Sequence, residues 1–365
     1  MTESHNRSER NPVVYVGTYT TVRPKGTEGI FVYRLDMANG ALALDSAIDA
    51  GPNPSFLALS PDGKYLYAVN ETMDLDGQPG GGVSALAVDA ATARLTCLNR
   101  QRSHGGLPCY VSIDQTGRYV MVANYATGSA AILPVQSDGR LSQASDVVQH
   151  TGSSVNRKRQ EGPHAHSIVL DPGNRLAYVP DLGIDRVMIY EVDYDAGKLK
   201  PHGSVGVHPG AGPRHLTFHP NERLVYLIEE VDSTLTAFHY DAASGDLTEI
   251  QTVSTLPPGF TGSNTCADVH VSPSGQYVYG SNRGHDSIAV FAIDQQTGMM
   301  TLVGHQSTLG KTPRNFAIDP TGAYLLAANQ DSDTIVSFRI DPASGKLSET
   351  GQMTEVHMPV CIRFA

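Results

Sequence analysis

At residues 54–71 the chain reads PSFLALSPDGKYLYAVNE. Apolar residues alternate at its start, a Ser-Pro-Asp-Gly turn follows, and a second apolar run, KYLYAVN, leaves the turn. Alternating apolar residues are typical of β-strands, and proline and glycine supply the backbone angles that a tight turn requires. The stretch therefore predicts two β-strands joined by a turn.

The same pattern recurs along the chain at a spacing of about 47–57 residues. The later copies are PCYVSIDQTGRYVMVANY (108–125), AHSIVLDPGNRLAYVPDL (165–182), PRHLTFHPNERLVYLIEE (213–230), CADVHVSPSGQYVYGSNR (266–283) and PRNFAIDPTGAYLLAANQ (313–330). A third strand follows, as in SIAVFAID (287–294), and a fourth begins near a D-x-x-S-G-x-L element, as in DAASGDLTEIQTV (241–253). Four strands per unit with short turns are typical of one β-propeller blade.

The two chain ends predict how many blades there are. The segments VVYVGTYT (13–20) and GIFVYRLD (29–36) match the second and third strands of a unit, and PVCIRFA (359–365) matches a first strand. Pairing the N- and C-terminal strands closes the ring and covers both sheet edges. We therefore predict an all-β, seven-bladed β-propeller of four-stranded blades, as a single domain at 13–365 after a disordered tail at 1–12.

The composition limits the kinds of partner. Of 365 residues 40% are hydrophobic and 17% charged, which suits a globular core, and the net charge is −11. An acidic surface without a basic stripe argues against nucleic-acid and anionic-membrane partners. An anionic substrate must then be attracted by a local group of arginines or lysines.

Cysteine spacing and the N-terminal sequence indicate the compartment. Cys97, Cys109, Cys266 and Cys361 show no CxxC spacing, so we expect buried, reduced thiols and neither a zinc site nor a disulfide framework. The first residues, MTESHNRSERN, are polar, and no run of about 18 apolar residues occurs. These features predict a cytoplasmic location and no membrane partner.

Equivalent repeat positions predict where side chains meet, because the innermost strand of every blade lines the central channel. One ring, at the start of the inner strand, comprises Ser55, Cys109, His166, Arg214, Ala267, Arg314 and Val360. A second ring, after the second strand, comprises Tyr19, Glu71, Tyr125, Leu182, Glu230, Arg283 and Gln330. We expect His166, Arg214, Glu230 and Arg283 to share one cleft, with Asp268 and His270 on the neighbouring inner strand.

This combination of side chains suits acyl transfer to water. Opening a lactone requires a base for the attacking water, for which His166 is the first candidate and Glu230 the alternative. A guanidinium, from Arg214 or Arg283, can stabilise the charge that develops on the carbonyl oxygen. The predicted catalytic residues are thus His166, Arg214, Glu230 and Arg283, with the base left open between His166 and Glu230.

A long insertion before His166 carries Arg157, Lys158 and Arg159 in an otherwise acidic chain. Forked guanidinium donors fit phosphate oxygens, so the run is a candidate phosphate-binding rim, with a solvated loop as the alternative. The full set of predicted substrate-binding residues is His164, Arg159, Asp268, His270, Arg314 and Glu71.

Several of these residues have a structural alternative. His164 and His166 share a strand face, which suits a metal pair, a catalytic pair or a channel wall. Arg214 beside Glu230 is alternatively a structural ion pair. A third column, comprising Asn70, Asn124, Asp181, Glu229, Asn282 and Asn329, offers calcium ligands or, alternatively, strand-end caps. We predict no metal and no cofactor.

At this point the residues resemble a known family, the seven-bladed β-propeller lactonases, which include propeller-type 6-phosphogluconolactonase and fungal carboxymuconate lactonizing enzyme. The resemblance covers about Val13 to Phe364, and its most specific matches are RQEGPHAHSIVLDP (159–172), GAGPRHLTFHPNERLVYLIEE (210–230), ADVHVSPSGQYVYGSNRGHDSIAVF (267–291) and MPVCIRF (358–364). The resemblance implies a cofactor-free site whose His, Arg, Glu and Arg fall on His166, Arg214, Glu230 and Arg283. The adjacent Glu229 leaves open which carboxylate points inward.

The leading hypothesis that the resemblance implies is hydrolysis of 6-phospho-D-glucono-1,5-lactone to 6-phosphogluconate in the pentose phosphate pathway. The alternatives are a cycloisomerase acting on a muconate-type dicarboxylate and a non-catalytic binding propeller. The expected partner is a small anionic sugar lactone, and we expect a monomer or a weak homodimer.

Overall fold

The computed structural model describes residues 11–23, 26 and 28–365. Residues 1–10 of the predicted tail lie outside the described residues. Within that predicted tail, Pro12 already accepts a hydrogen bond from the backbone N–H of Leu35, at 2.9 Å. The start of the propeller domain at residue 13 stays a prediction.

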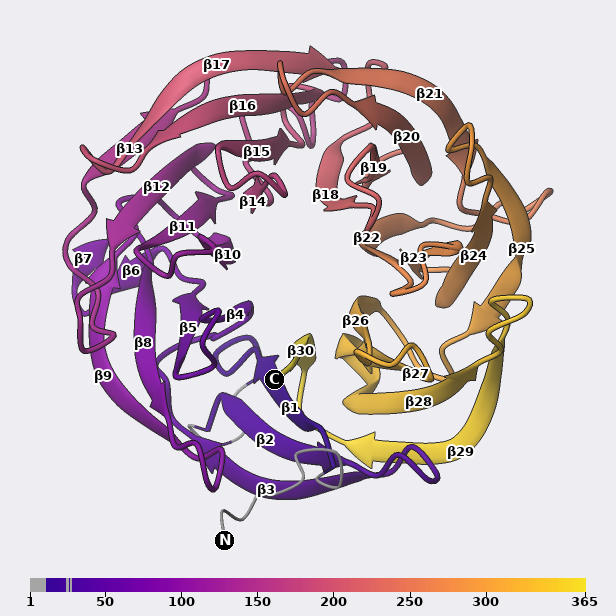
Figure 1. Ribbon diagram of the computed structural model, residues 1–365, viewed down its shortest axis with the longest axis horizontal. Helices are drawn as coiled ribbons and strands as arrows, with labels where there is room; N and C mark the ends of the chain where they lie inside the picture. The colour runs from indigo at the N-terminus through magenta and orange to yellow at the C-terminus, as the bar shows by residue number, and fades with distance from the viewer. Residues whose placement is uncertain (1–10, 24–25, 27) are drawn as a thin grey trace, which may run out of the picture.

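The described residues form seven four-stranded antiparallel sheets arranged as a ring around a central axis (Figure 1). The strands of each sheet are named here from the innermost to the outermost. The first sheet comprises β30 (Pro359–Phe364), β1 (Val13–Thr18), β2 (Ile30–Leu35) and β3 (Leu42–Ile48), and the second comprises β4 (Leu57–Leu59), β5 (Tyr65–Asn70), β8 (Gly82–Val88) and β9 (Leu95–Arg102). The third sheet comprises β10 (Pro108–Ile113), β11 (Tyr119–Asn124), β12 (Ser129–Pro134) and β13 (Asp146–Gln149), and the fourth comprises β14 (Val169–Leu170), β15 (Leu176–Asp181), β16 (Arg186–Asp193) and β17 (Lys198–Gly206).

The remaining three sheets follow the same order. They are β18 (Pro213–Phe218), β19 (Leu224–Glu229), β20 (Thr234–Tyr240) and β21 (Leu247–Ser254); β22 (Thr265–Val271), β23 (Tyr277–Arg283), β24 (Ser287–Ile293) and β25 (Met300–Ser307); and β26 (Pro313–Ile318), β27 (Tyr324–Asn329), β28 (Thr334–Ile340) and β29 (Leu347–Glu355). A small hairpin of β6 (Asp74–Leu75) and β7 (Gln78–Pro79) and a 3-10 turn (Gln330–Ser332) complete the described elements.

The ring closes as the sequence predicts. Strand β30, from the C-terminus, pairs antiparallel with β1, from the N-terminus, so both ends of the chain contribute to one blade. The predicted all-β, seven-bladed propeller is confirmed.

A repeated contact fixes each blade against the next. A buried tyrosine of a second strand donates its hydroxyl hydrogen to the carbonyl of the glycine in the outer turn of the following blade. The pairs are Tyr67 with Gly139 at 3.1 Å, Tyr178 with Gly245 at 2.6 Å, Tyr226 with Gly298 at 3.1 Å and Tyr279 with Gly345 at 2.9 Å. Each glycine has φ between +69° and +84°, which L-residues rarely adopt. A glycine is thus required by the turn on which the tyrosine docks, and in two blades it is the glycine of the D-x-x-S-G element, Gly245 and Gly345.

All four asparagines of the third column also join blades. Their side-chain amides donate to carbonyls that follow the outer strand of the preceding blade: Asn70 to Ala50 at 3.0 Å, Asn124 to Ser103 at 3.3 Å, Asn282 to Thr255 at 2.9 Å and Asn329 to Thr308 at 3.0 Å. The structure therefore uses these groups as strand-end caps. Within the described chain, no cluster of three or more His, Cys, Asp or Glu is arranged to hold a metal ion.

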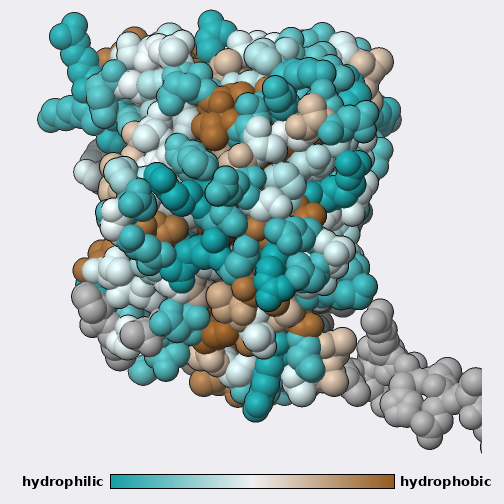
Figure 2. Space-filling model, turned by 90° about the vertical axis from the view of Figure 1, so that its left-hand side faces the viewer, coloured by the Kyte–Doolittle hydropathy of each residue, from teal (hydrophilic) through white to brown (hydrophobic). Residues whose placement is uncertain are grey.

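The outer surface is mainly hydrophilic. Seen from one side, hydrophobic residues form small separate spots between polar ones (Figure 2). Cys109, Cys266 and Cys361 are buried, but the prediction of a buried thiol is wrong for Cys97, which is exposed on the outer strand β9. An outer strand presents one of its faces to solvent, so alternation alone does not bury every apolar residue that it carries.

Candidate functional site

A repeated β-bulge directs the first predicted ring into the channel. In β10, β18 and β26 the pairing with the second strand shifts just after the initial proline, so that Cys109, Arg214 and Arg314 have no partner in the ladder. A bulge leaves the extra residue unpaired and re-aims its side chain. As a result, two consecutive residues of an inner strand face the channel at different depths.

A cavity of about 410 Å³ lies where the two predicted rings meet. Its lining comprises Tyr19, Glu71, Leu107, Cys109, Tyr125, Arg159, His166, Glu230, Thr265, Arg283 and Arg314. Six of the predicted site residues are therefore brought together: His166, Glu230, Arg283, Arg159, Arg314 and Glu71. Four others, namely Arg214, His164, Asp268 and His270, do not line this cavity.

Glu230 is the most highly connected group of the cavity. Its Oε2 accepts from Arg214 Nε at 2.9 Å and pairs with Arg283 Nη2 at 2.8 Å, and its Oε1 accepts from Arg159 Nη2. Burial opposes ionisation of this carboxyl, but the guanidinium groups of Arg283 and Arg214 hold its pKa well below the ordinary value. Glu230 is therefore a carboxylate at neutral pH, and it is the inward-pointing member of the Glu229–Glu230 pair.

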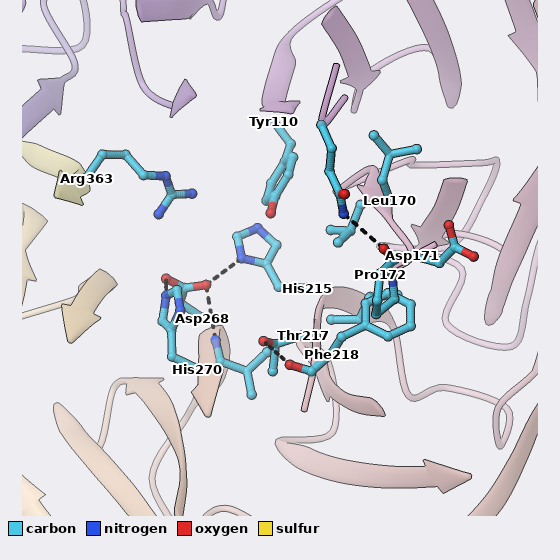
Figure 3. Close-up of a pocket in the computed structure, with 14 residues that line it drawn as sticks. Tyr110, Leu170, Asp171, Pro172, His215, Thr217, Phe218, Asp268, His270 and Arg363 are labelled. Atoms are coloured by element: carbon cyan, nitrogen blue, oxygen red, sulfur yellow. Dashed lines mark hydrogen bonds and ion pairs between the residues drawn. The ribbon is translucent and has the colours of Figure 1, made fainter. Parts of the chain in front are cut away.

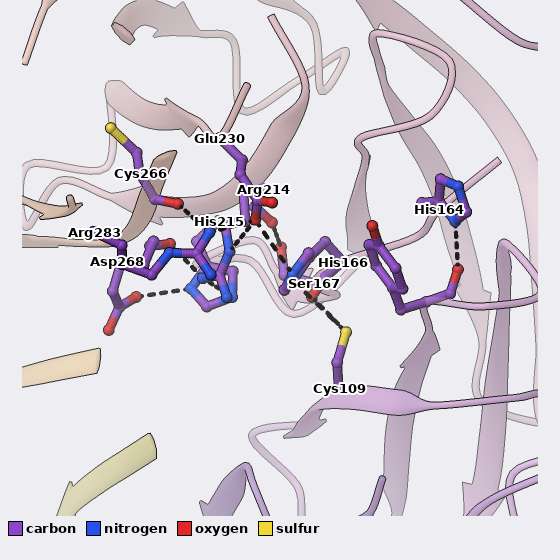
Figure 4. A network of polar contacts seen from close by, with 12 residues as sticks. Cys109, His164, His166, Ser167, Arg214, His215, Glu230, Cys266, Asp268 and Arg283 are labelled. Atoms are coloured by element: carbon purple, nitrogen blue, oxygen red, sulfur yellow. Dashed lines mark hydrogen bonds and ion pairs between the residues drawn. The ribbon is translucent and has the colours of Figure 1, made fainter. Parts of the chain in front are cut away.

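His166 lies beside this carboxylate (Figure 4). Its Nε2 is 3.9 Å from Glu230 Oε2, and its Nδ1 is 3.6 Å from the sulfur of Cys109. Burial, followed by the positive charge of Arg214, lowers the pKa of His166 well below the ordinary value. The imidazole is therefore neutral at neutral pH and able to accept a proton.

Arg214 lies beneath the cavity instead of lining it. It is only 2% exposed, and Nη1 donates to the carbonyl of Ala267. Burial, and then the charges of Arg283 and Arg314, lower the pKa of Arg214 to about 10, which leaves the guanidinium charged at neutral pH. Its contact with Glu230 is a buried, charge-assisted hydrogen bond.

The opposite wall of the cavity carries a second carboxylate and a free guanidinium. Both oxygens of Glu71 accept from the Tyr19 hydroxyl, at 3.0 and 2.9 Å, and Oε2 also accepts from Ser55. Arg314 lies with its Cζ 5.5 Å from the centroid of the Tyr19 ring and makes no hydrogen bond or ion pair with a described residue. Its donors therefore face the cavity without a partner among the described residues.

The predicted position of Asp268 and His270 is corrected by the structure. Both line a different cavity, of about 380 Å³, further along the channel, together with His215, Tyr110 and Arg363 (Figure 3). The bulge in β22, where register is lost between Cys266 and Val269, places Asp268 one layer below the first ring. Arg214 and His215 separate these two residues from the cavity that holds Glu230.

His164 is held away from His166 by its own contacts. Its Nδ1 lies 3.0 Å from the carbonyl oxygen of Tyr125, and its ring stacks on the Tyr125 ring at a centroid distance of 4.6 Å. The Tyr125 ring also contacts His166, edge to face, at 5.3 Å. The two imidazoles thus share one aromatic neighbour and do not form a joint ligand pair.

The basic run contributes one residue to the cavity. Arg157 and Lys158 are exposed and lie outside the lining, whereas Arg159 reaches inward to Glu230 and places Nη2 3.3 Å from the Tyr125 hydroxyl oxygen. Local turns explain the difference, since Arg159 N–H bonds back to the Asn156 carbonyl and turns the chain toward the channel.

Sequence reasoning missed several lining residues. Tyr19, Cys109 and Tyr125 belong to the two predicted rings. The predicted site residues were those whose side chains are charged near neutral pH, so these three were not among them. His215 stands in neither ring, because the bulge that makes it face the channel has no signature in the alternation of apolar residues.

Glu229 gives a testable contrast with Glu230. Its side chain is fully buried, Oε1 has no partner among the described residues, and Oε2 accepts from Thr234 at 3.2 Å. Burial raises the pKa of this carboxyl well above the ordinary value, so it holds its proton in the folded chain.

Replacing Glu229 by Gln is expected to raise Tm at pH 8 and to leave it nearly unchanged at pH 4. The unfolded chain releases the Glu229 proton above about pH 4.3, so wild-type stability is fully present below that pH and is lost as pH rises toward the folded pKa. Gln has no proton to release. Thermal unfolding by circular dichroism at both pH values measures the effect, and a clear fall in Tm at pH 8 would show that the carboxylate form is needed.

Comparison with known proteins extends these findings. A family model described as "Lactonase, 7-bladed beta-propeller" matches residues 13–364. The 6-phosphogluconolactonase of Bacillus subtilis is 39% identical over 302 residues, which are 83% of this chain and 83% of that protein. The 6-phosphogluconolactonase of Formosa agariphila is 36% identical over 310 residues, or 84% of this chain and 86% of that protein.

Solved structures agree with the sequence relatives. The periplasmic gluconolactonase of Pseudomonas aeruginosa superposes with a TM-score of 0.91 at 35% identity, covering 97% of this chain and 99% of that one. Within the described residues no helix has the length and apolar character that crossing a bilayer requires. The similarity extends over the blades that carry the cavity as well as over the rest of the ring.

Proposed function

Because the chain belongs to the family of seven-bladed β-propeller lactonases, we propose that it hydrolyses 6-phospho-D-glucono-1,5-lactone to 6-phosphogluconate, a step of the pentose phosphate pathway. Lactone hydrolysis is the activity for which the Bacillus subtilis and Formosa agariphila relatives are named. One observation carries the choice of a phosphorylated substrate: three guanidinium groups, those of Arg159, Arg283 and Arg314, line the cavity that holds His166 and Glu230.

The phosphate end of the substrate is proposed to bind at Arg314. This guanidinium has no partner among the described residues, whereas Arg159 and Arg283 are already paired with Glu230. Guanidinium donors match phosphate oxygens in a bidentate manner, and the charge of the substrate offsets that of the arginine. In a chain of net charge −11, this local positive charge attracts an anion that the overall surface repels.

The lactone carbonyl is proposed to lie between His166 and Arg283. Neutral His166 takes a proton from water through Nε2 while the water oxygen bonds to the carbonyl carbon, and the Glu230 carboxylate stabilises the imidazolium that forms. Arg283 donates to the developing oxyanion. The ring C–O bond then breaks, the imidazolium returns its proton to the leaving oxygen, and the new carboxylic acid releases a proton to solvent.

A direct assay tests this function. Purified protein is added to freshly prepared 6-phosphogluconolactone at constant pH, and the rate of acid release is compared with the spontaneous rate. We expect saturable acceleration in proportion to protein concentration. A correctly folded protein that leaves the spontaneous rate unchanged rules the proposal out, and turnover of a muconate-type dicarboxylate instead points to the cycloisomerase alternative.

Replacing Arg314 by Gln is expected to raise KM for the phosphorylated lactone by about 10- to 100-fold with little change in kcat, because a charge-assisted hydrogen bond contributes about 1.5–3 kcal/mol. The unphosphorylated glucono-1,5-lactone lacks the group that Arg314 is proposed to bind, so its kcat/KM changes little. Steady-state kinetics with both lactones measure the effect.

Arg157→Gln is the matched control, since it removes an exposed arginine outside the cavity. An equal loss of kcat/KM on both substrates in Arg314→Gln would place the phosphate elsewhere.

A cytoplasmic location is part of the proposal, because a phosphorylated sugar carries charge that a bilayer does not admit unaided. The related P. aeruginosa protein is named as periplasmic, so cell fractionation is the appropriate check. The predicted monomer or weak homodimer is tested by light scattering during gel filtration.

A further inference from the structure

A line of buried polar groups connects the proposed active-site cavity with the second cavity of the channel (Figures 3 and 4). It runs from Glu230 to Arg214, then to His215 and then to Asp268. The four residues are 2–4% exposed. Each is joined to the next by a contact of 2.9, 3.2 and 2.7 Å, in that order.

The direction of every hydrogen bond in this line follows from Arg214. A guanidinium has only donors, so Arg214 Nη1, 3.2 Å from His215 Nε2, requires a lone pair on that nitrogen. The His215 proton must then be on Nδ1, which is 2.7 Å from Asp268 Oδ1. Asp268 Oδ1 therefore accepts, and His215 is a neutral imidazole in the Nδ1–H form.

Asp268 is surrounded by donors on its other oxygen as well. Asn315 Oδ1 accepts from the backbone N–H of Ile362 at 2.7 Å, so its amide nitrogen faces Asp268 Oδ2 and donates to it. His270 Nε2 is 2.9 Å from the same oxygen, and Val269 N–H donates to Oδ1 at 3.1 Å. Because Asn315, Val269 and His215 all donate to Asp268, this side chain acts as an acceptor at both of its oxygens.

The His215 ring is also fixed by packing. It meets Tyr110 edge to face at 5.1 Å, Phe56 at 5.7 Å and His166 at 5.3 Å. These three contacts hold the plane of the ring, and the hydrogen bonds to Arg214 and Asp268 place Nε2 and Nδ1 within it. The choice of tautomer therefore depends on the hydrogen-bond partners alone.

We propose that Asp268 and His215 are positioning residues, which hold Arg214 against Glu230 and so keep that carboxylate in place beside His166. The inference rests on the proposed function, and it assigns a role to two residues that do not line the proposed substrate cavity. A carboxylate that fixes the tautomer of a histidine, which in turn orients a third group, is a recurring arrangement in enzyme sites.

Asp268→Asn is expected to disturb this line without removing volume. An amide in place of the carboxylate turns one N–H₂ toward a donor, either His215 Nδ1–H or the Asn315 and His270 pair. If the N–H₂ faces His215, the histidine moves its proton to Nε2, where it opposes Arg214. If it faces Asn315 instead, the hydrogen bond that anchors the side chain of residue 268 is lost. We expect kcat to fall by about 10- to 100-fold and KM to change less than about threefold, as for other outer-shell partners.

A double-mutant cycle tests whether Asp268 acts through His215. His215→Gln places an amide oxygen near the Nε2 position, which preserves an acceptor for Arg214 and removes the connection to Asp268. We expect Asp268→Asn to lower kcat in the wild-type background and to have no further effect in the His215→Gln background. An equal effect of Asp268→Asn in both backgrounds overturns the proposal.

Glu229→Gln is the matched control for a buried carboxyl-to-amide exchange on a neighbouring strand end, and its kcat is expected to remain within about twofold of wild type. Tm is measured for every variant, so that a loss of folded protein is distinguished from a loss of kcat.

A spectroscopic measurement decides the hydrogen-bond directions independently of activity. In ¹⁵N-histidine NMR of the wild-type protein, the signal that disappears in His215→Gln is expected to show the neutral Nδ1–H form. A neutral Nε2–H form or an imidazolium at pH 7 overturns the proposal even if the enzyme is active. If wild type shows no lactonase activity but His215 has the expected form, the proposed function fails and the geometry of the line stands.

Discussion

Replacing His166 by Asn is expected to lower kcat for 6-phosphogluconolactone by about 10²- to 10⁴-fold, the usual contribution of a positioned general base. The Asn amide lies near the position of Nδ1 and keeps a polar contact with the Cys109 sulfur, 3.6 Å away in wild type. It places nothing at the position of Nε2, the atom 3.9 Å from Glu230 that faces the water in the proposed mechanism. Stopped-flow measurement of acid release gives kcat, and KM is expected to change little.

The pH dependence of the wild type adds to this test. Because burial and Arg214 lower the pKa of His166, the imidazole stays unprotonated at pH values where a free imidazole is charged. The acid limb of the kcat/KM profile is therefore expected below pH 6.5. A wild-type profile that falls between pH 7 and pH 6, or an Asn variant that retains kcat within about threefold, excludes His166 as the base.

Replacing Glu230 by Gln is expected to affect both stability and catalysis. The carboxylate is paired with Arg214, Arg283 and Arg159, so its neutralisation leaves buried positive charge without compensation. Breaking a buried ion pair in this way costs about 3–5 kcal/mol, which for a chain of 365 residues corresponds to a fall in Tm of about 4–6 °C. Differential scanning calorimetry at pH 7 measures this loss.

The effect of Glu230→Gln on Tm is expected to depend on pH. Its folded pKa is held well below the value of about 4.3 expected in the unfolded chain, so its contribution to stability is present above pH 4.3 and is lost as pH falls toward the folded pKa. The difference in Tm between wild type and Glu230→Gln should therefore narrow in acid.

Glu229→Gln supplies the opposite case on the adjacent residue, because its Tm should exceed that of wild type as pH rises. Equal Tm changes for the two variants at every pH would contradict the assignment of Glu230 as the charged member and Glu229 as the neutral one.

The kinetic constants of Glu230→Gln test what the carboxylate does in catalysis. If it stabilises the His166 imidazolium and positions the guanidinium groups, kcat falls by at least about tenfold at pH 7 while the Arg314-dependent preference for the phosphorylated lactone remains. Loss of that preference would instead show that the arginines had left the cavity.

The alternation of apolar residues, the turns and the glycine-containing outer loops are local features, and they predict the blades correctly. The chain ends complete the prediction, since a second and third strand at residues 13–36 require a first strand, which PVCIRFA at residues 359–365 supplies. Equivalent columns of a repeat also identify residues that face the channel, which is why the sequence alone places His166, Glu230, Arg283 and Arg314 in one cavity.

The depth at which each site residue lies along the channel was decided by the tertiary structure. The alternation of apolar and polar residues along a strand indicates which face of the sheet each side chain occupies. A bulge inserts one extra residue and makes two successive side chains point inward. For this reason Arg214 lies beneath the cavity, His215 was missed, and Asp268 and His270 belong to the second cavity. The contacts that set charge, such as Arg159 with Glu230, join residues 71 positions apart in the sequence, and only the packing of consecutive blades brings them within hydrogen-bonding distance.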